Sequence, residues 1–414
     1  MHYIQHTNHC LSDANRAEVT ALCERLAGYE QALKNGFDAK AKPILDLCHR
    51  EDDLPAIQAL ADKIRARFDH VIICGSGGSG LSGEVLRNIE LKAKRPTLHV
   101  LDNIDPVEID ALFADCPPEK TYIIAISKSG NTVETISQFF AFYHHFKPTL
   151  GNKINEHFMV LTMPSDSPLR RFATENAITL MDHPSDIGGR FSLFTAVGLL
   201  PAALMGLPIA DFRIGAADVI AKLGQATHPA RLGAALQYNA IQQGKNLSVM
   251  LPYCQRLANF STWYRQCWAE SLGKNGKGST PIRAVGTTDQ HSQLQLYLDG
   301  PNDKFFTLIF HERTGGGQAI HAPDYPELDY LKNKTTGDVI GAEQQATLET
   351  LVHNKRSVRL LTLEVLNEKS LGALLAHFML EIFFMAQLLE VDPFDQPAVE
   401  EGKILARNYL LGQA

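Results

Sequence analysis

Residues 122–132 read Tyr-Ile-Ile-Ala-Ile-Ser-Lys-Ser-Gly-Asn-Thr. The first five residues form a continuous apolar run, which is typical of a strand buried on both faces of a parallel sheet. The polar segment 127–132 follows directly and precedes a helical pattern at 132–146. The sequence therefore predicts a strand, a short loop and a helix, with the loop at the carboxyl end of the strand, where such sheets bind ligands.

The loop at 127–132 has the composition of a phosphate-binding segment. Its hydroxyls, the flexible Gly130 and the free backbone N–H groups at a helix start can surround a dianion, and Lys128 adds a positive charge. The same residue types are common in ordinary strand-to-helix turns, where they turn and cap the chain. From the residues alone, both interpretations stay open. The candidate phosphate ligands are Ser127, Lys128, Ser129 and Thr132.

Strand-like apolar runs recur along the chain and alternate with helical patterns. In the first half of the chain, strands are predicted at 70–74, 97–101, 121–126 and 157–162. In the second half, they are predicted at 247–252, 282–286, 304–311 and 357–365. Strands that are linked by helices form parallel sheets covered on both faces. The sequence thus predicts an α/β fold with two doubly wound domains, whose mainly parallel sheets are flanked by helices.

The bulk composition limits the kinds of partner. The chain has 414 residues, a formal net charge of −7, 45% hydrophobic residues and 21% charged residues. These values suit a soluble globular protein of two domains, and the negative charge argues against a nucleic-acid partner. The seven cysteines are scattered and never form a CxxC pair. We therefore expect reduced thiols, a cytoplasmic location and no metal site.

Neither a signal peptide nor a membrane span is expected. The first ten residues are polar, which is unlike a secretory signal. Two apolar stretches, 193–210 and 371–391, are long enough to cross a membrane. The first contains two prolines and predicts a core helix from near Arg190 to before Pro208. The second contains ionisable side chains that a lipid-facing helix would exclude.

A second glycine-rich loop follows the predicted strand at 70–74. Residues 75–80 read Gly-Ser-Gly-Gly-Ser-Gly and open the next predicted helix. They fit a dinucleotide-binding loop only loosely, and Asp102 is a weak candidate for the acid that binds the ribose. The glycines equally allow a sugar phosphate to approach the backbone, and we favour this interpretation.

The two loops together resemble the sugar isomerase (SIS) domain, in which the second loop holds the substrate phosphate. Four further segments are similar to signatures of the glucose-6-phosphate isomerase family and follow the family's order. They are GGRFS at 188–192, QCWAESLGK at 266–274, GTTDQHS at 286–292 and FDQPAVEEGK at 394–403. Leu272 stands where the family often has Asn, and Ala398 where it often has Gly, but neither difference removes a reacting group. The length suggests a compact bacterial form.

The resemblance implies an isomerase that interconverts glucose 6-phosphate and fructose 6-phosphate through a cis-enediol, with no cofactor and no metal. Moving the carbonyl between C1 and C2 requires a base, and Glu270 is the candidate. Arg190 would stabilise the negative charge on the enediol oxygens, while His291 and Lys403 would open the sugar ring. Without the resemblance, each of these four residues has an ordinary structural or surface interpretation. Gln266 and Gln396 would bind sugar hydroxyls, and Gly78 and Ser79 would line the sugar.

The resemblance also implies a cytoplasmic homodimer of glycolysis and gluconeogenesis, in which His291 completes the neighbouring subunit's site. The expected partners are a sugar phosphate and a second copy of the chain, with no nucleic acid and no membrane. The expected domains are an N-terminal helical arm at 1–48, a first SIS domain with the phosphate loop at 49–210, a second SIS domain with the catalytic base at 211–395, and a C-terminal helix at 396–414 that closes the active site.

Two other functions fit parts of the pattern. A dual isomerase would also convert mannose 6-phosphate, but archaeal members of that kind are shorter and differ at the C-terminal motif, so the segment 394–403 argues against it. A SIS regulator without catalytic activity would keep the phosphate loop. It would have no reason to keep Glu270, His291 and Lys403 together.

Overall fold

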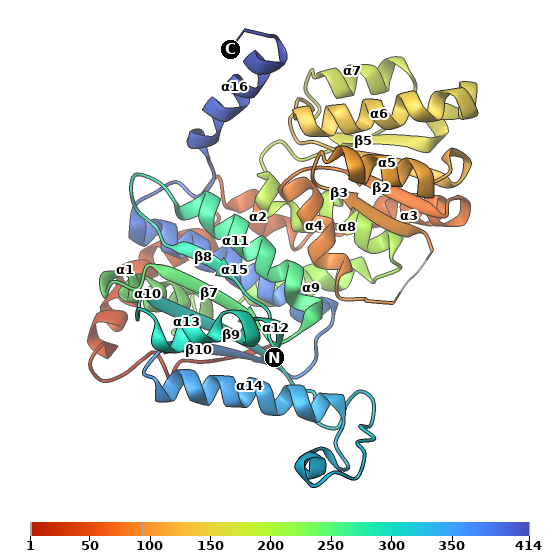
Figure 1. Cartoon of the computed structure of the whole chain (residues 1–414). Helices are drawn as coiled ribbons and strands as arrows, with labels where there is room; N and C mark the ends of the chain where they lie inside the picture. The colour runs from red at the N-terminus through yellow and green to blue at the C-terminus, as the bar shows by residue number, and fades with distance from the viewer. Residues whose placement is uncertain (1, 93–94, 414) are drawn as a thin grey trace.

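The computed structural model describes residues 2–92 and 95–413. In this part of the chain, two five-stranded sheets are flanked by helices, as Figure 1 shows. Seven of the eight strand pairs are parallel. The prediction of an α/β fold with two mainly parallel sheets is confirmed.

The first sheet has the strand order β3-β2-β4-β5-β6. Its central strands are apolar because both faces are covered, so that Ile72 and Val71, which point to opposite faces, belong to different core clusters. Helices α5, α6 and α7 cover one face, and α3, α4 and α8 cover the other. The strands are β2 (His70–Cys74), β3 (Thr97–Leu101), β4 (Thr121–Ile126), β5 (Phe158–Thr162) and β6 (Thr179–Asp182), and the helices are α3 (Leu54–Arg67), α4 (Gly78–Arg87), α5 (Pro106–Asp115), α6 (Val133–Leu150), α7 (Pro168–Glu175) and α8 (Ala196–Leu204).

The second sheet has the strand order β1-β10-β9-β7-β8. Helices α10, α11 and α15 pack on one side of it, and α13 and α14 on the other. Its strands are β1 (Ile4–His6), β7 (Leu247–Pro252), β8 (Thr280–Arg283), β9 (Lys304–His311) and β10 (Ser357–Leu363), and its helices are α10 (Pro229–Gln242), α11 (Ala258–Leu272), α12 (Thr288–Ser292), α13 (Leu294–Asp299), α14 (Thr336–His353) and α15 (Glu368–Leu389).

The N-terminal segment differs from its prediction as a helical arm. It begins with β1, which pairs antiparallel with β10, so that Gln5 lies opposite Leu361. The backbone groups at the edge of β10 need partners, and even a three-residue strand supplies some of them. The rest of the segment is helical, with α1 (Arg16–Lys34) packed against α10 and α15 and followed by α2 (Lys42–Leu47). The N-terminus is thus part of the second sheet.

The core helix that was expected to run from Arg190 to Pro208 is interrupted. A 3-10 turn, Gly189–Phe194, precedes α8, and Thr195 separates the two. The Thr195 hydroxyl accepts a hydrogen bond from the Val197 N–H, which caps the start of α8. This break leaves Arg190 in the turn rather than in a helix.

The two sheets share one continuous hydrophobic core. Helix α4 of the first half packs against α11 of the second, and α9 (Ile209–Ile220) packs against α15. Among the described residues, α15 is the one helix long and apolar enough to cross a membrane, but 94% of its most apolar window is buried inside the protein. Helix α15 is therefore a core helix, and its ionisable residues had argued against a lipid-facing one.

The C-terminal helix stands apart from the rest of the chain. A 3-10 turn, Pro397–Val399, leads into α16 (Glu400–Leu410), which extends away from both sheets in Figure 1. None of the residues of α16 is buried. In the single chain, this helix does not cover the edge of either sheet.

Candidate active site

The glycine-rich loop after β2 lies against the turn that contains Arg190. A β-carbon added to Gly78 would lie 2.4 Å from the Gly189 carbonyl oxygen and 2.8 Å from the Arg190 nitrogen, so only glycine fits there. Gly77 has a φ of +59°, and a β-carbon there would lie 3.2 Å from the Gln266 side-chain nitrogen. The loop therefore brings the first sheet into contact with α11, which carries Gln266 and Glu270.

Arg190 is buried and uses its whole guanidinium group. Its Nε donates to Ser271 at 2.8 Å, and its Nη1 donates to Glu270 Oε2 at 3.3 Å and to Gln396 Oε1 at 2.7 Å. Its Nη2 donates to the carbonyl oxygens of Pro393 and Asp395. A guanidinium has five N–H groups, and all five have a partner here. Arg190 thus fixes the segment 393–396 beside Glu270.

Glu270 is held from two sides and still reaches solvent. Its Oε1 accepts a hydrogen bond from the Gln266 side chain at 2.8 Å, one helical turn earlier on α11, and Arg190 contacts its Oε2. The Glu270 side chain is 34% exposed, whereas that of Arg190 is 2% exposed. A carboxylate that is oriented by two neighbours and open on one side has the geometry of a base that a substrate can approach.

Two polar atoms at this place are buried without a hydrogen-bond partner among the described residues. They are the side-chain oxygen of Gln266 and the hydroxyl of Ser76 in the glycine-rich loop. Buried polar atoms usually have partners, so both are free to bind a ligand hydroxyl. Ser76 is a residue that the sequence prediction missed, although it lies inside the motif at 75–80.

The second loop has the expected form at the start of α6. The Ser127 hydroxyl lies 2.9 Å from the Thr132 hydroxyl and accepts a hydrogen bond from the Gly130 N–H at 3.1 Å. The Ser129 hydroxyl accepts one from the Asn131 N–H at 3.2 Å. Gly130 has a φ of +65°, which favours glycine. The four predicted phosphate ligands therefore share one compact loop.

The surroundings of this loop shift the pKa of Lys128. Burial lowers the pKa of the half-buried Lys128, the Asp186 carboxylate partly opposes this effect, and the Arg190 cation adds a smaller lowering. Lys128 also lowers the pKa of His183, although burial has the larger effect on that histidine. An anion close to a lysine favours its charged form. An anion bound at this loop would therefore restore the charged form of Lys128, which burial disfavours.

The structure does not bring every predicted residue to this site. His291 lies in α12 and is exposed, and in the part of the chain that the structure describes its side chain forms no hydrogen bond or ion pair. Lys403 lies in α16, where its ammonium group pairs with Glu400 at 2.6 Å and the side chain is 64% exposed. The roles predicted for these two residues stay predictions.

Lys274 is a further site residue to which the sequence analysis gave no role. It donates to the carbonyl oxygen of Asp392 and pairs with Asp395 at 2.7 Å. Lys274, the last residue of the motif at 266–274, therefore holds a segment that overlaps the one that Arg190 holds. The motif was visible in the sequence, but the partner segment lies more than 100 residues away.

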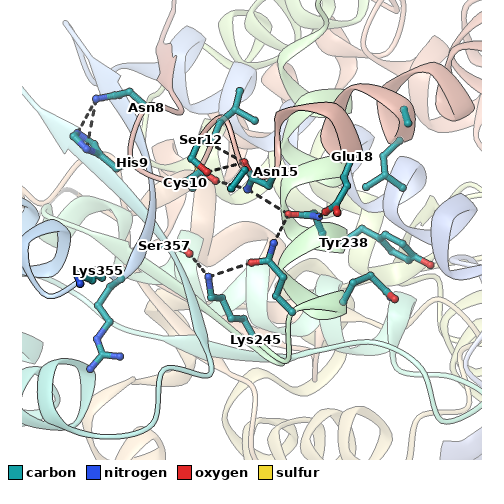
Figure 2. A pocket seen from close by; sticks show the side chains of 18 of the residues that line it. Asn8, His9, Cys10, Ser12, Asn15, Glu18, Tyr238, Lys245, Lys355 and Ser357 are labelled. Atoms are coloured by element: carbon teal, nitrogen blue, oxygen red, sulfur yellow. Dashed lines mark hydrogen bonds between the residues drawn. The ribbon is translucent and has the colours of Figure 1, made fainter.

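A large cavity elsewhere in the molecule does not contain any of the predicted site residues. It has a volume of about 1010 Å³ and lies between the N-terminal segment, α1, the end of α10 and the start of β10, as Figure 2 shows. Many of its polar groups bond to one another, such as Lys245 to Ser357 and Asn15 to Asn239. The candidate active site is therefore the open region around Glu270 rather than this cavity.

The chain is similar in sequence to known isomerases over most of its length. A sequence model described as phosphoglucose isomerase matches residues 60–303. A glucose-6-phosphate isomerase of Carboxydothermus hydrogenoformans is 36% identical over 387 residues, which cover 88% of this chain and 83% of the relative. Another, from Rubrobacter xylanophilus, is 36% identical over 371 residues, which cover 85% of each chain.

Two solved structures resemble this one over nearly its full length. The crystal structure of a hypothetical protein from Thermus thermophilus has a TM-score of 0.89 at 29% identity and covers 99% of both chains. A glucose-6-phosphate isomerase from Chlamydia trachomatis has a TM-score of 0.81 at 21% identity, covering 97% of this chain and 86% of that one, and so shares the fold.

Proposed function

Because the chain belongs to the phosphoglucose isomerase family, we propose that it interconverts glucose 6-phosphate and fructose 6-phosphate with Glu270 as the base. The observation that carries this assignment is the half-open Glu270 carboxylate, which Gln266 and Arg190 orient beside the glycine-rich loop. The family resemblance drawn from the sequence motifs is confirmed by these matches, and so is the class of enzyme, an aldose–ketose isomerase.

In the proposed reaction, the loop at 127–132 binds the phosphate and places the sugar toward α11. Glu270 removes the proton from C2 of the open-chain aldose and returns it to C1, which moves the carbonyl from C1 to C2. The Nη1 of Arg190 lies next to this carboxylate, so its charge would stabilise the negative oxygen of the enediolate. Ser76 and Gln266 would accept hydrogen bonds from sugar hydroxyls through their free oxygens. Gly78 and Ser79 would line the sugar, and the Gln396 side chain would bind a hydroxyl.

We further propose that the active enzyme is a cytoplasmic homodimer. His291 and Lys403 would catalyse ring opening, and both are exposed in the single chain. Exposure of His291 agrees with its predicted role in the neighbouring subunit's site. The proposed halves are the phosphate-binding domain at 49–210 and the base-bearing domain at 211–395, with 396–414 closing the site in the assembled enzyme.

The direct test is the reaction in deuterated water. Fructose 6-phosphate incubated with the protein should yield glucose 6-phosphate with deuterium at C2, because Glu270 exchanges its proton with solvent before it is returned. Nuclear magnetic resonance of the product detects both the sugar and the label. Formation of mannose 6-phosphate in the same tube would show a broader specificity. Absence of both aldose and label would overturn the assignment.

The Glu270→Gln variant tests the named base. The amide keeps the size of the side chain but cannot accept the substrate proton, so turnover should fall by about two to four powers of ten while fructose 6-phosphate still binds. The matched control is Glu84→Gln on the neighbouring helix α4, where Glu84 pairs with Arg87 and Asn259 away from the proposed chemistry. Near-normal turnover in Glu270→Gln would remove Glu270 from its role.

A further inference from the structure

A group of possible metal ligands lies in the first sheet, apart from the proposed active site. His70 begins β2, His99 lies in β3, and Cys116 follows α5. The strands are parallel, and His99 is paired with Ile72, two residues after His70. The two histidines therefore point to the same face of the sheet, the face that α5 covers.

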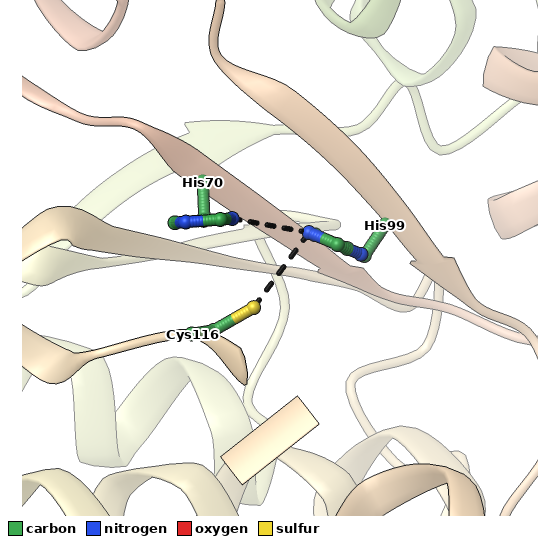
Figure 3. A group of neighbouring side chains, drawn as sticks. All are labelled: His70, His99 and Cys116. Atoms are coloured by element: carbon green, nitrogen blue, oxygen red, sulfur yellow. Dashed lines mark hydrogen bonds between the residues drawn. The ribbon is translucent and has the colours of Figure 1, made fainter. Parts of the chain in front are cut away.

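The ligand atoms of these three side chains converge, as Figure 3 shows. His70 Nδ1 and His99 Nε2 are 3.3 Å apart, and Cys116 Sγ lies 3.6 Å from His99 Nε2. All three residues can present ligand atoms that lie within 4.8 Å of one another. In a tetrahedral zinc site, with Zn–N of about 2.0–2.1 Å and Zn–S of about 2.3 Å, neighbouring ligand atoms lie about 3.3–3.6 Å apart.

Hydrogen bonding alone does not account for this convergence. An imidazole nitrogen carries either one proton or one lone pair in the ring plane, so His99 Nε2 can make one well-directed hydrogen bond. It has two close neighbours, the nitrogen of His70 and the sulfur of Cys116. A cation placed between the three atoms would instead meet a lone pair from each of them.

We propose that His70, His99 and Cys116 bind one zinc-type divalent cation, with a water molecule or another small ligand in the fourth position. Two imidazoles and one thiolate form a ligand set of the borderline-soft kind that Zn²⁺ prefers over Mg²⁺ or Ca²⁺. Binding replaces the thiol proton of Cys116, which passes to the buffer, and involves no redox change. The fully buried sulfur and two half-buried imidazoles limit access of solvent to the bound ion.

The position of the cluster indicates a structural role. His70 is the first residue of β2, whereas the glycine-rich loop follows the last residue of the same strand. The cation would link β2, β3 and the end of α5 at the edge of the sheet opposite to the proposed active site. The bound ion should therefore raise the thermal stability and leave isomerase turnover unchanged. The spacing of 29 and 17 residues between the three ligands gave no sign of this site in the sequence.

Cobalt and zinc binding to the reduced full-length protein tests the proposal. One equivalent of Co²⁺ should produce sulfur-to-cobalt charge-transfer absorption, together with the intense visible bands of a tetrahedral site. Added Zn²⁺ should displace the Co²⁺ and remove these bands. Zn²⁺ should also raise the melting temperature. The Cys116→Ser variant should lose the charge-transfer absorption. The His99→Asn variant should weaken Zn²⁺ binding by at least about a hundredfold, since mutating even a residue that only hydrogen-bonds to a metal ligand lowers metal affinity about ten- to a hundredfold.

Matched controls separate this site from other thiols and histidines. Cys23→Ser changes a half-buried thiol on α1, and His9→Asn changes one of the N-terminal histidines. Both controls should bind Co²⁺ like the wild type. Isomerase activity reports whether each variant is folded. A folded wild type that binds no stoichiometric Co²⁺ would overturn the proposal, as would charge-transfer absorption that persists in Cys116→Ser. Either result leaves the isomerase assignment untouched.

Discussion

At the scale of single residues, Arg190 combines two tasks in one side chain. Its buried guanidinium contacts Glu270 and also holds two backbone carbonyls of the segment 393–396. Lysine has only three N–H donors on a flexible stem and cannot reproduce a planar five-donor arrangement. The geometry therefore explains why arginine, and not just any cation, suits this position.

The Arg190→Lys variant should lose about two to three powers of ten in turnover, because lysine keeps the charge but cannot hold it in a fixed position beside Glu270, where we propose that negative charge develops. Steady-state kinetics with fructose 6-phosphate would measure kcat and KM separately. The control is Arg213→Lys, since Arg213 is equally buried and bonds to Asp53 and to the Phe194 carbonyl. The control should lower the free energy of unfolding without the loss in kcat. Equal kcat losses in both variants would show that Arg190 acts only through the fold.

The stability of the protein should depend on His228 at mildly acidic pH. His228 is fully buried, its Nε2 donates to the Val219 carbonyl, and its Nδ1 accepts the Ala230 N–H at the start of α10. Burial lowers the pKa of His228 to about 4. The unfolded chain binds the proton from about pH 6.5 downward, so stability is fully present above pH 6.5 and is lost as the pH falls toward 4. Because of this residue alone, the free energy of unfolding should fall by about 2 kcal/mol from pH 7 to pH 5.

Urea unfolding of wild type and His228→Asn at both pH values isolates this effect. Asparagine also caps helices well but does not titrate, so the variant should lack this part of the pH dependence. The stability difference between the two proteins should shrink by about 2 kcal/mol from pH 7 to pH 5. A parallel loss of stability in both proteins would assign the acid sensitivity to other groups.

At the scale of elements, the strands were predictable because burial on both faces leaves a plain apolar signal. All six residues of β4 are buried, and its prediction at 121–126 was confirmed. In contrast, α7 and β6 were missed, since β6 is a half-exposed edge strand that ends in Asp182. The position of the loop at 127–132 followed from the strand before it. The bonds of Arg190 could not be predicted, because their partners lie 80 to 206 residues away.

Helix α15 shows a second feature that no periodicity reveals, a buried ion pair. Glu381 accepts a hydrogen bond from Arg359 of β10 at 2.6 Å, and both side chains are fully buried. His377 also contacts Glu381 and bonds to Tyr3, which lies next to β1. Burial alone would raise the pKa of Glu381, but Arg359 and His377 outweigh it and lower the pKa to about 2. The network thus ties α15 to the second sheet and the N-terminus.

Replacing Glu381 with Gln should lower the free energy of unfolding by about 3–5 kcal/mol, because the Arg359 charge stays buried without its partner. Equilibrium urea unfolding at pH 7 measures this change. The control is Asp46→Asn, which breaks the exposed pair with Lys42 and should cost at most about 0.5 kcal/mol. If the free energy of unfolding of Glu381→Gln falls by less than about 1 kcal/mol, the prediction is wrong, and water or a rearranged side chain stabilises the buried Arg359 charge.

At the scale of the whole molecule, the single chain holds only part of the proposed catalytic machinery. Glu270 and Arg190 are in contact, whereas His291 and Lys403 are exposed on other elements. Helix α16 also exposes apolar side chains, namely Ile404, Leu405, Tyr409 and Leu410. A helix with several exposed apolar residues is typical of an interaction surface. These features support the proposed homodimer, in which each site would combine residues of two chains.

Complementation between inactive variants tests this assembly. The test uses a dimer of one Glu270→Gln chain and one His291→Ala chain, purified through two different tags. If His291 acts across the interface, this dimer contains one intact site, because the intact histidine of one chain meets the intact glutamate of the other. Such a heterodimer should show about half the wild-type turnover per dimer, since twofold symmetry gives two sites. The control pairs Glu270→Gln with Arg190→Lys. These two residues contact each other within one chain, so each site in the control dimer has one defect and activity should stay low. If the first heterodimer is as inactive as its parents, His291 does not complete the neighbouring site.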